Sequence, residues 1–484
     1  MLSESLTSES VPDDLVYFAD GDRCLVVNPE VGAWQVIDGA ELDLLRRLAL
    51  GQSFPLSDPE GIERALARLV MACLIYLPGR RPRPRRMNRT PRTVYYAITD
   101  GCNLRCPHCY ASSAKRRSDE LDTAASLDLI EQIAAIGAET VVFTGGEALL
   151  RADLFIVAQR VRERGMQAHL ITNGTLLRRG ETARSIADTF TAVTVSLDGG
   201  TAEVHERMRG KGTFARTLTA LRLLNEVGVR PLINFVATQE SVKSLPALCE
   251  ALSGLEVRAV RAIHHSALGR GASDGFLFEW PDYQALYDFF ASESGSQVLL
   301  PEGSPTMTQR SGKVNCGMGG TEIYVDSRGD VFPCRLITDE AHLAGNIRQG
   351  SLSEIFAAPV MVDLRSSAVF AGENLPDCHG CYVRGICAGG CRAFHRARTG
   401  DLRRNSREVC RMQRHETIAS MWASAGAQRD SVVDNPGSAH CPVVVRTGER
   451  HPAFDPTASA VTAAVADAGM RRRNLRVQIL GGAR

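Results

Sequence analysis

Three cysteines, Cys102, Cys106 and Cys109, occupy one short segment directly after the apolar run 94–98. A short apolar run of this kind predicts a buried strand, so we expect the cysteines on a loop at a strand end. Three thiolates at this compact spacing can hold three irons of a cubane cluster and leave the fourth iron open to a small molecule. They can also contribute to a zinc site whose fourth ligand comes from elsewhere. The spacing alone therefore predicts a metal centre and leaves both identities open.

Strand-like and helix-like patterns alternate between Thr93 and Leu268. The expected strands are residues 93–98, 140–144, 168–172, 192–197, 231–237 and 258–264. Helix patterns lie between them, for example at residues 123–136, 153–164, 213–226 and 244–252. Six such units predict an α/β fold with a parallel barrel or partial barrel. In barrels of this type the chemistry lies at the carboxyl ends of the strands.

Polar motifs follow successive expected strands at that end. They are Gly145-Gly146-Glu147 after the second strand, Thr172-Asn173-Gly174 after the third and Ser196-Leu197-Asp198-Gly199 after the fourth. Two adjacent glycines let the backbone approach a ligand closely, and Glu147 can accept a hydrogen bond from a cationic amine. Ser196 and Asp198 face the same side of a strand, as a pair of groups meeting a ribose or a carboxylate would. Each motif is a common turn sequence, but their order behind the three cysteines is hard to produce by chance.

The cysteine loop and the ordered motifs together resemble the radical S-adenosylmethionine (SAM) superfamily, and Asn103, Leu104 and His108 also match its cysteine motif. The resemblance implies a partial (β/α)6 TIM-like barrel. It implies that the three loop cysteines hold a 4Fe–4S cluster whose open iron binds SAM. The bound SAM then supplies a 5′-deoxyadenosyl radical, which takes hydrogen from an unactivated carbon, while the protein orients the cofactor and excludes water.

The same resemblance assigns the residues that contact SAM. They are Gly145, Gly146 and Glu147 at the methionine amino group, together with Asn173, Ser196 and Asp198. An arginine after the fourth strand can pair with the SAM carboxylate, and the sequence does not choose between Arg207 and Arg209. Ala148 stands where the family often has proline. The loop 264–271 corresponds to a glycine- and arginine-containing loop near the adenosine, and its two histidines are expected to be structural.

Seven further cysteines lie between residues 316 and 410, at Cys316, Cys334, Cys378, Cys381, Cys387, Cys391 and Cys410. Their spacing resembles the SPASM extension of radical SAM peptide maturases, with a pair of zinc ribbons as the alternative. The resemblance implies two auxiliary 4Fe–4S clusters. One is held by Cys378, Cys381, Cys387 and Cys410, and the other by only Cys316, Cys334 and Cys391. The preceding residues 307–315 contain no cysteine. A substrate thiolate or a non-cysteine ligand is therefore expected at the last iron.

Residues 14–78 carry three short apolar runs followed by two helix patterns, at residues 40–50 and 59–74. This order resembles the PqqD-like precursor-peptide recognition domain, a winged-helix fold in which a leader peptide adds as a strand to a sheet edge. DNA binding, or simple packing on the enzyme, is the alternative. Residues 79–92 are rich in proline and arginine and are expected to form an extended linker.

The expected domains are a recognition domain at 14–78, a linker at 79–92, a barrel at 93–300, a SPASM domain at 301–415 and an extension of unknown role at 416–484. The chain of 484 residues has a formal charge of +1, which argues against a dedicated nucleic-acid binder. We expect no signal peptide and no membrane span, because no apolar run approaches roughly 18 residues. Fourteen cysteines in such a chain indicate metal binding or catalysis rather than disulfides, which fits the cytoplasm.

The sequence therefore predicts a radical SAM/SPASM oxidoreductase that modifies a ribosomally made precursor peptide. A thioether crosslink is the first expectation, because of the three-cysteine set, and a carbon–carbon crosslink of the cofactor-precursor or cyclophane type is the alternative. The expected partners are the peptide and an electron donor such as flavodoxin or ferredoxin, without nucleic acid or membrane. An iron–sulfur electron-transfer protein and a DNA-binding sensor are the hypotheses from other classes.

Overall fold

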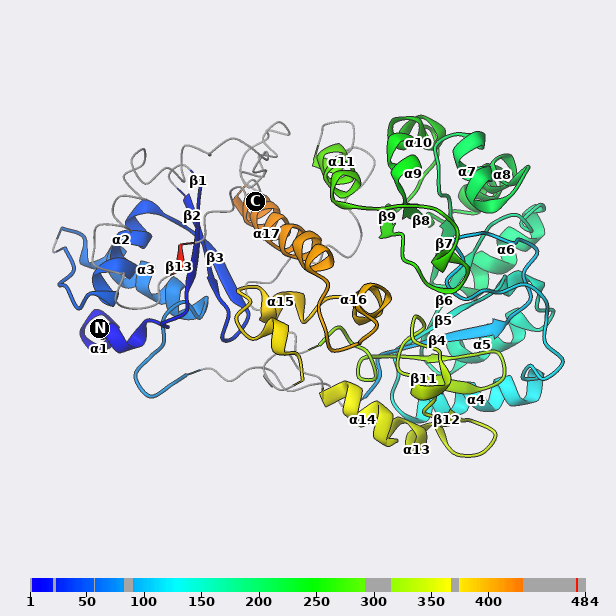
Figure 1. The fold of residues 1–484 in the computed structure, drawn as a ribbon, viewed down its shortest axis with the longest axis horizontal. Helices are drawn as coiled ribbons and strands as arrows, with labels where there is room; N and C mark the ends of the chain where they lie inside the picture. Colours follow the sequence, from blue (N-terminus) through cyan, green and yellow to red (C-terminus); the bar gives the residue numbers. More distant parts are fainter. Residues whose placement is uncertain are drawn as a thin grey trace.

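Two β-sheets and the helices packed on them organise the chain (Figure 1). The computed structural model describes residues 2–20, 23–55, 57–81, 90–291, 315–366, 374–429 and 476–477. Most of the expected linker 79–92, the start of the expected SPASM domain and most of the expected extension 416–484 lie outside the described residues. No helix of the described part is both long and apolar enough to cross a membrane.

The larger sheet is built around six parallel strands. They are β4 (Thr93–Thr99), β5 (Thr140–Gly145), β6 (Gln167–Thr172), β7 (Ala192–Ser196), β8 (Leu232–Ala237) and β9 (Ala259–His264), adjacent in that order. Each agrees with an expected strand to within one residue at either end. Val141, Phe143 and Ile233 are fully buried, because a parallel sheet covered by helices needs apolar side chains. The expected partial barrel is therefore confirmed.

Helices connect or follow these strands, and those between successive strands cover the outer face of the sheet (Figure 1). They are α4 (Thr123–Ala135), α5 (Leu154–Glu163), α6 (Gly180–Thr189), α7 (Ala202–Arg209), α8 (Thr213–Glu226), α9 (Gln239–Lys243), α10 (Leu245–Leu252) and α11 (Trp280–Ala291). Several of these helices begin at a residue whose side chain accepts a hydrogen bond from a free backbone amide of the first turn. Asp122, for example, accepts from the amide of Ala125 at the beginning of α4. Loops, rather than helices, therefore lie at the carboxyl ends of the strands.

Three further strands extend the same sheet beyond β4. They are β10 (Glu322–Val325), parallel to β4, and then β11 (Asp330–Phe332) and β12 (Gly345–Asn346), both antiparallel to their neighbours. The sheet therefore crosses the boundary that the sequence placed at residues 300–301. The helices of this part are α13 (Leu352–Phe356), α14 (Pro359–Ser366), α15 (Arg384–Cys387), α16 (Arg392–Thr399) and α17 (Arg407–Arg429). Helix α17 likewise runs through the expected boundary at residue 416.

The smaller sheet contains β1 (Val16–Asp20), β2 (Arg23–Asn28) and β3 (Ala33–Asp38) as an antiparallel meander. A short α1 (Leu2–Ser5) precedes it, and α2 (Gly39–Ala49) and α3 (Pro59–Met71) follow. Helix α3 ends three residues before the expected Leu74, and Cys73 beyond it has a left-handed φ of 55°. Strand β13 (Arg476–Val477) pairs in parallel with the outer edge of β1.

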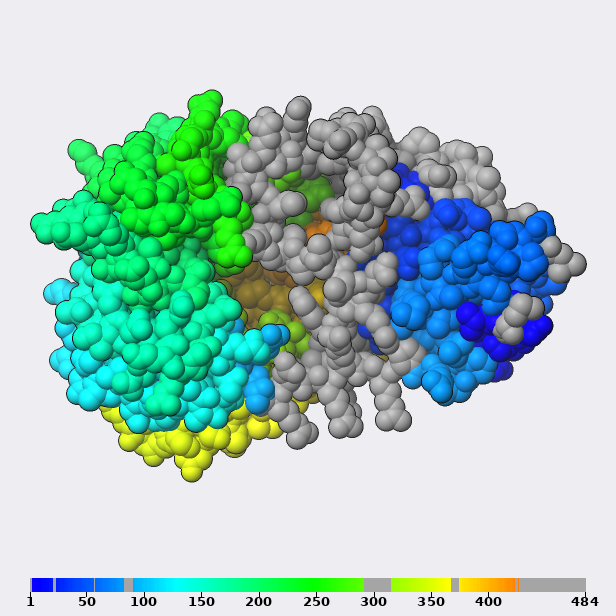
Figure 2. Space-filling view, turned by 180° about the vertical axis from the view of Figure 1, so that it is seen from behind, coloured from blue at the N-terminus to red at the C-terminus, as the bar shows by residue number. Residues whose placement is uncertain are grey.

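Both faces of this smaller sheet are buried. One face packs on α2 and α3, and the other packs on α15 and α17, where the rings of Phe18 and Tyr382 lie 5.4 Å apart. Asp14 pairs with Arg384 at 3.1 Å. Figure 2 shows this lobe and the barrel on opposite sides of the molecule, with the segments of α16 and α17 visible between them. The amino-terminal lobe is thus docked on the SPASM helices rather than separate from the body.

Candidate cluster and cofactor site

The loop of Cys102, Cys106 and Cys109 leaves the carboxyl end of β4. Hydrogen bonds between Cys102 N and Ala114 O (3.0 Å) and between Ala114 N and Asp100 O (3.1 Å) close its base. The pKa of the Cys102 thiol is raised to about 11, mainly by burial, with smaller contributions from Cys106 and Cys109. The three thiols therefore lie near one another on this loop. A bound metal displaces the proton from such thiols, and three thiolates fit a cubane with one open iron.

Gly145 and Gly146 bring the loop after β5 against this cysteine loop. A Cβ on Gly145 would lie 2.2 Å from Thr99 O, and one on Gly146 would lie 2.1 Å from Gly101 O. Gly146 N donates to Thr99 O and Glu147 N donates to Gly101 O, each at 2.8 Å. The two glycines therefore serve backbone contact between loops, whereas the sequence suggested approach to a ligand.

Glu147 and Asn173 extend this network to the loop after β6. The buried Glu147 carboxylate accepts from Thr172 Oγ1 at 2.7 Å and from Asn173 N at 2.8 Å. Burial raises the pKa of Glu147, and these hydrogen bonds oppose the rise. Asn173 Nδ2 donates to Asn103 Oδ1 on the cysteine loop, and Asn103 Nδ2 donates to Thr175 Oγ1. Glu147, Asn173 and Asn103 are thus connected through hydrogen bonds. The sequence analysis did not select Thr175 as a site residue, because it lies in an ordinary turn sequence.

Asp198 forms the centre of a buried charge cluster. Its carboxylate pairs with Arg209, lies 3.3 Å from His108 Nε2 and accepts from Val236 N at 2.9 Å. Burial would raise the pKa of Asp198, but the charge of Arg209 and the hydrogen bond with His108 outweigh it and hold the pKa well below its usual value. Asp198 thus fixes Arg209, which the resemblance placed beside SAM, and His108 of the cysteine motif.

Arg207 and Arg209 are separated by the structure. The Arg207 side chain is 63% exposed and pairs with Glu240 on the surface at 2.7 Å, whereas the Arg209 side chain is 12% exposed. The two arginines are two positions apart on α7, so they point to different sides of the helix. Arg207 therefore lies outside the site in which the sequence analysis included it.

Three buried polar atoms in this region have no hydrogen-bond partner among the described residues. They are His108 Nδ1, His205 Nε2 and Asn234 Oδ1. Asn234 on β8 stands opposite the buried Ser196 on β7, and the strand neighbours Val195 and Ile233 belong to the core beneath the helices. Alternation along a strand therefore directs Ser196 and Asn234 to the inner face of the barrel. Because an unsatisfied buried polar atom is costly, these atoms fit a polar ligand.

The loop 264–271 clamps the cysteine loop. Arg270 donates from Nε to Cys106 O at 2.9 Å and from Nη1 to Ser113 O at 2.8 Å. Gly269 has a φ of 56°, and a Cβ on it would lie 2.2 Å from Tyr110 O. This loop was expected near the adenosine, and the structure places its arginine on the backbone of the cysteine loop.

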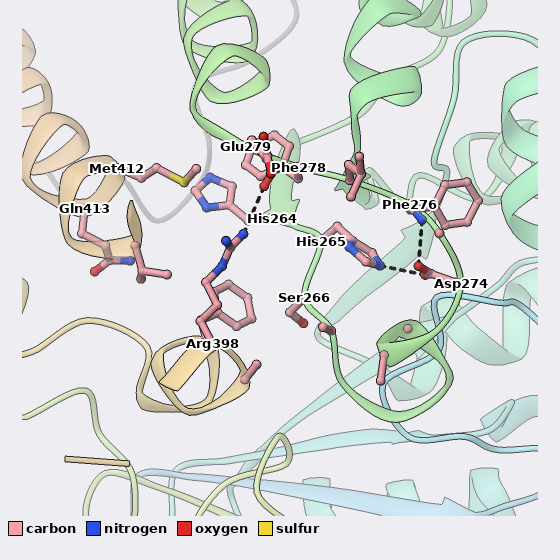
Figure 3. A pocket seen from close by; sticks show the side chains of 18 residues that line it. His264, His265, Ser266, Asp274, Phe276, Phe278, Glu279, Arg398, Met412 and Gln413 are labelled. Carbon is pink, nitrogen blue, oxygen red and sulfur yellow. Dashed lines mark hydrogen bonds and ion pairs between the residues drawn. The ribbon is translucent and has the colours of Figure 1, made fainter. Parts of the chain in front are cut away.

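A cavity of about 350 Å³ lies between this loop and the helices α16 and α17 (Figure 3). His265 Nε2 lies 2.7 Å from Asp274 Oδ2, and the His264 ring stacks on Phe278 with centroids 4.8 Å apart. Burial lowers the pKa of His264 to about 4. Arg398 closes the far wall by donating to Phe278 O at 3.4 Å. The cavity is walled by the barrel and the SPASM helices together, a juxtaposition that no local pattern in the sequence signals.

The SPASM cysteines fall into two groups according to which thiols affect one another. The pKa of Cys387 is raised to about 12, mainly by burial, with smaller contributions from Cys381, Cys378 and Cys410. Burial raises the pKa values of Cys334 and Cys391, and Cys316 adds to both. The assignment of these two sets to separate clusters stays a prediction. No three His, Cys, Asp or Glu side chains of the described part meet as closely as a single ion requires, and a cubane spreads its ligands over separate irons.

Comparison with known families and proteins gives matches across this region. Residues 96–240 match the radical SAM superfamily, and residues 316–382 match the SPASM iron–sulfur cluster-binding domain. The AdoMet-dependent heme synthase of Methanosarcina barkeri is 30% identical over 339 residues, which covers 65% of this chain and 95% of that protein. The mycofactocin maturase MftC of Mycobacterium ulcerans is 30% identical over 321 residues, covering 63% and 83%. The subtilosin biosynthesis protein AlbA of Bacillus subtilis is 25% identical over 310 residues, covering 61% and 68%.

Solved structures share the fold. The anSMEcpe structure with bound AdoMet has a TM-score of 0.59 at 20% identity and covers 71% of this chain and 96% of that one. Streptococcus suis SuiB bound to S-adenosylmethionine has a TM-score of 0.55 at 16% identity and covers 83% and 99%. SuiB has also been solved with its precursor peptide SuiA, and that structure has a TM-score of 0.53.

Proposed function

The chain belongs to the radical SAM superfamily and carries a SPASM domain, and from this premise we propose that the enzyme crosslinks a ribosomally made precursor peptide. The observation that carries the proposal is the cavity between the barrel and the SPASM helices. It offers a peptide side chain a place bounded by both domains. Relatives named as a mycofactocin maturase and a bacteriocin biosynthesis protein support a peptide substrate.

The family brings a 4Fe–4S cluster with SAM, and its SPASM domain brings auxiliary clusters. When bound, the cluster and SAM supply abstraction of a hydrogen atom from an unactivated carbon. We assign the cluster ligands to Cys102, Cys106 and Cys109, and the auxiliary ligands to the sets Cys378, Cys381, Cys387, Cys410 and Cys316, Cys334, Cys391. Arg270 holds the first loop in place through its backbone carbonyls.

The polar residues of the barrel mouth orient SAM in this proposal. Glu147 accepts a hydrogen bond from the methionine amino group, because its carboxylate has lone pairs that the existing hydrogen bonds do not use. Arg209 pairs with the methionine carboxylate. Ser196 and Asn234 accept or donate at the ribose hydroxyls. Asp198 acts as a positioning residue, because its charge fixes the side chain of Arg209 from behind.

Residues 14–78 bind the leader of the precursor peptide in this proposal. Within the described residues no strand pairs with the outer edge of β3, so that edge can accept an added strand. SuiB, which has been solved with its precursor peptide SuiA, matches 83% of this chain, a share that requires part of residues 1–90. The sheet also packs against Cys381 and Cys387 of the four-cysteine auxiliary set, which supports a leader bound close to the chemistry.

Thioether formation is the proposed crosslink, because the set of Cys316, Cys334 and Cys391 leaves one iron that a substrate thiolate can occupy. The test uses anaerobically reconstituted enzyme, a reductant, SAM and the peptide encoded by a short reading frame beside the gene. We expect a peptide that has lost two hydrogens together with deoxyadenosine. Replacing the core cysteine by serine should stop crosslinking while deoxyadenosine still forms. Normal crosslinking of the serine peptide would refute the thioether and favour a carbon–carbon bond.

A second candidate function follows from the heme synthase relative, of which this chain covers 95%. An iron porphyrin precursor supplied in place of the peptide tests it directly. Heme formation in that assay, with no modification of the peptide, would replace the proposed function.

A further inference from the structure

The auxiliary set of Cys316, Cys334 and Cys391 is one protein ligand short of a complete cubane. We propose that the Glu322 carboxylate is the missing ligand. Neither the family matches nor the cysteine spacing assigns this residue, because it is the first residue of a short strand and belongs to no cysteine motif. The assignment concerns the auxiliary cluster alone and does not depend on which substrate the enzyme takes.

Backbone pairing places Glu322 beside Cys334. Strands β10 and β11 are antiparallel, with Tyr324 opposite Phe332. The same register continued by two residues sets Glu322 opposite Cys334, and directly opposite residues of an antiparallel pair project to the same face. Cys334 Sγ lies 3.8 Å from Glu322 Oε1 as a result. The proximity of thiol and carboxylate is therefore a property of the hairpin and not of one side-chain rotamer.

The backbone also sets Glu322 beside a second cysteine of the set. Glu322 N donates to Gly317 O at 3.1 Å, and Gly317 directly follows Cys316. Glu322 therefore lies between the segment of Cys316 and the strand partner Cys334. A ligand of the same cluster must occupy such a position.

The other polar side chains at these thiols are unsuited to ligation. Arg335 and Arg392, which also influence the three thiols, are cations and have no free lone pair. Asn315 uses its Oδ1 to accept from Gly317 N at 2.7 Å. Among the described residues this leaves Glu322 as the oxygen donor for which a contact to the set is shown.

Arg335 forms an ion pair with the Glu322 carboxylate and holds it beside the thiols. Its Nη1 lies 3.2 Å from Glu322 Oε1, and its guanidinium lies 4.4 Å from the centroid of the Tyr95 ring. The cation is thus held from two sides. Carboxylates are harder ligands than thiolates, and iron–sulfur clusters prefer the softer sulfur. An incoming thiolate can consequently displace Glu322 while Arg335 retains the released carboxylate.

This displacement, unlike the ligation itself, rests on the proposed thioether chemistry. The iron–oxygen bond to Glu322 breaks, an iron–sulfur bond to the substrate cysteine forms, and the thiol proton passes to the released carboxylate. No electron is transferred in the exchange. Failure of the thioether would leave the resting ligand unchanged, so the two ideas are tested separately.

The test uses the full chain with Cys102, Cys106 and Cys109 replaced by alanine, so that only the auxiliary clusters report. Glu322→Gln, Glu322→Cys and the unchanged background are reconstituted anaerobically, and iron and sulfide are counted before and after mild oxidation. We expect Glu322→Gln to lose an iron from one cluster and to give the EPR signal of a 3Fe–4S cluster. Glu322→Cys should keep its iron, because a fourth thiolate replaces the carboxylate.

Glu340→Gln serves as the matched control, since Glu340 is an exposed glutamate of the same domain, and it should behave as the background does. Full retention of iron by Glu322→Gln after oxidation would overturn the assignment. Loss of the cluster in Glu322→Gln without recovery in Glu322→Cys would overturn it as well, because that result indicates a structural role for the residue rather than ligation.

Discussion

Gly146→Ala tests whether the two loops at the barrel mouth must touch. Gly146 N and Glu147 N donate to carbonyl oxygens of the cysteine loop, each at 2.8 Å. A Cβ at position 146 would lie 2.1 Å from Gly101 O, closer than the 3.0 Å below which Cβ contacts are essentially never seen. The neighbour is backbone and cannot rotate away, so the loops must separate by about 1 Å.

The expected cost follows from the hydrogen bonds that this separation breaks. Two backbone hydrogen bonds of about 1 kcal/mol each disfavour the closed arrangement by about 2 kcal/mol. If SAM binds only the closed arrangement, its affinity falls by about 30-fold. The overall fold should persist, because the substitution lies outside the hydrophobic core.

Equilibrium dialysis of SAM against anaerobically reconstituted protein measures this loss, with iron content measured in parallel. Gly180→Ala is the matched control, because a Cβ there meets no atom within 4 Å and Gly180 begins helix α6. The control should bind SAM as the parent does. Parent-like affinity in Gly146→Ala would refute the claim that the site depends on contact between these loops.

Three further substitutions probe charge and packing. Arg209→Gln, which leaves a buried carboxylate unpaired, should destabilise the protein by about 3–5 kcal/mol in denaturant unfolding and weaken SAM binding, whereas the exposed Arg207→Gln should cost at most about 1 kcal/mol. The pKa of Asp153 is lowered to about 2, mainly by its hydrogen bonds with Arg151. The ionised carboxylate therefore stabilises the folded state fully above pH ~4, and this stabilisation is lost as the pH falls towards 2. In Asp153→Asn, the unfolding free energy of the cluster-free protein should change less with pH between ~4 and ~2. Gly32→Ala places a Cβ 2.4 Å from a carbonyl oxygen of α15 and should undock the amino-terminal lobe, which limited proteolysis would detect as faster cleavage. Gly51→Ala is the control, because Gly51 has the same φ of 65° but open space around it. Equal cleavage of both variants would count against the docking.

The six barrel strands could be predicted because buried parallel strands are short apolar runs, as at 94–98 and 140–144. The order of the polar motifs after them then located the site. Local patterns carry no information about which distant strand pairs with which, so the extension of the sheet by β10 beside β4 was not foreseen. Packing of the smaller sheet on the enzyme was among the alternatives, but its contact with α15 and α17 could not be located for the same reason.

The role of individual site residues depended on contacts that only the fold creates. Arg207 and Arg209 look alike in sequence, and the turn of α7 decides which one is buried beside Asp198. Glu322 has no signal in sequence, because its proximity to Cys334 follows from hairpin register. Pairing of His265 with Asp274 likewise arises from the loop after β9, and its ordinary composition gave no reason to select it.

The most direct test of the central claim is the EPR spectrum of the reduced, anaerobically reconstituted protein with and without SAM. We predict that SAM changes the signal of one cluster and that replacement of Cys102, Cys106 and Cys109 by alanine abolishes this change and the formation of deoxyadenosine. A triad that takes up zinc but no iron and sulfide, or a spectrum that SAM leaves unaltered, would contradict the account.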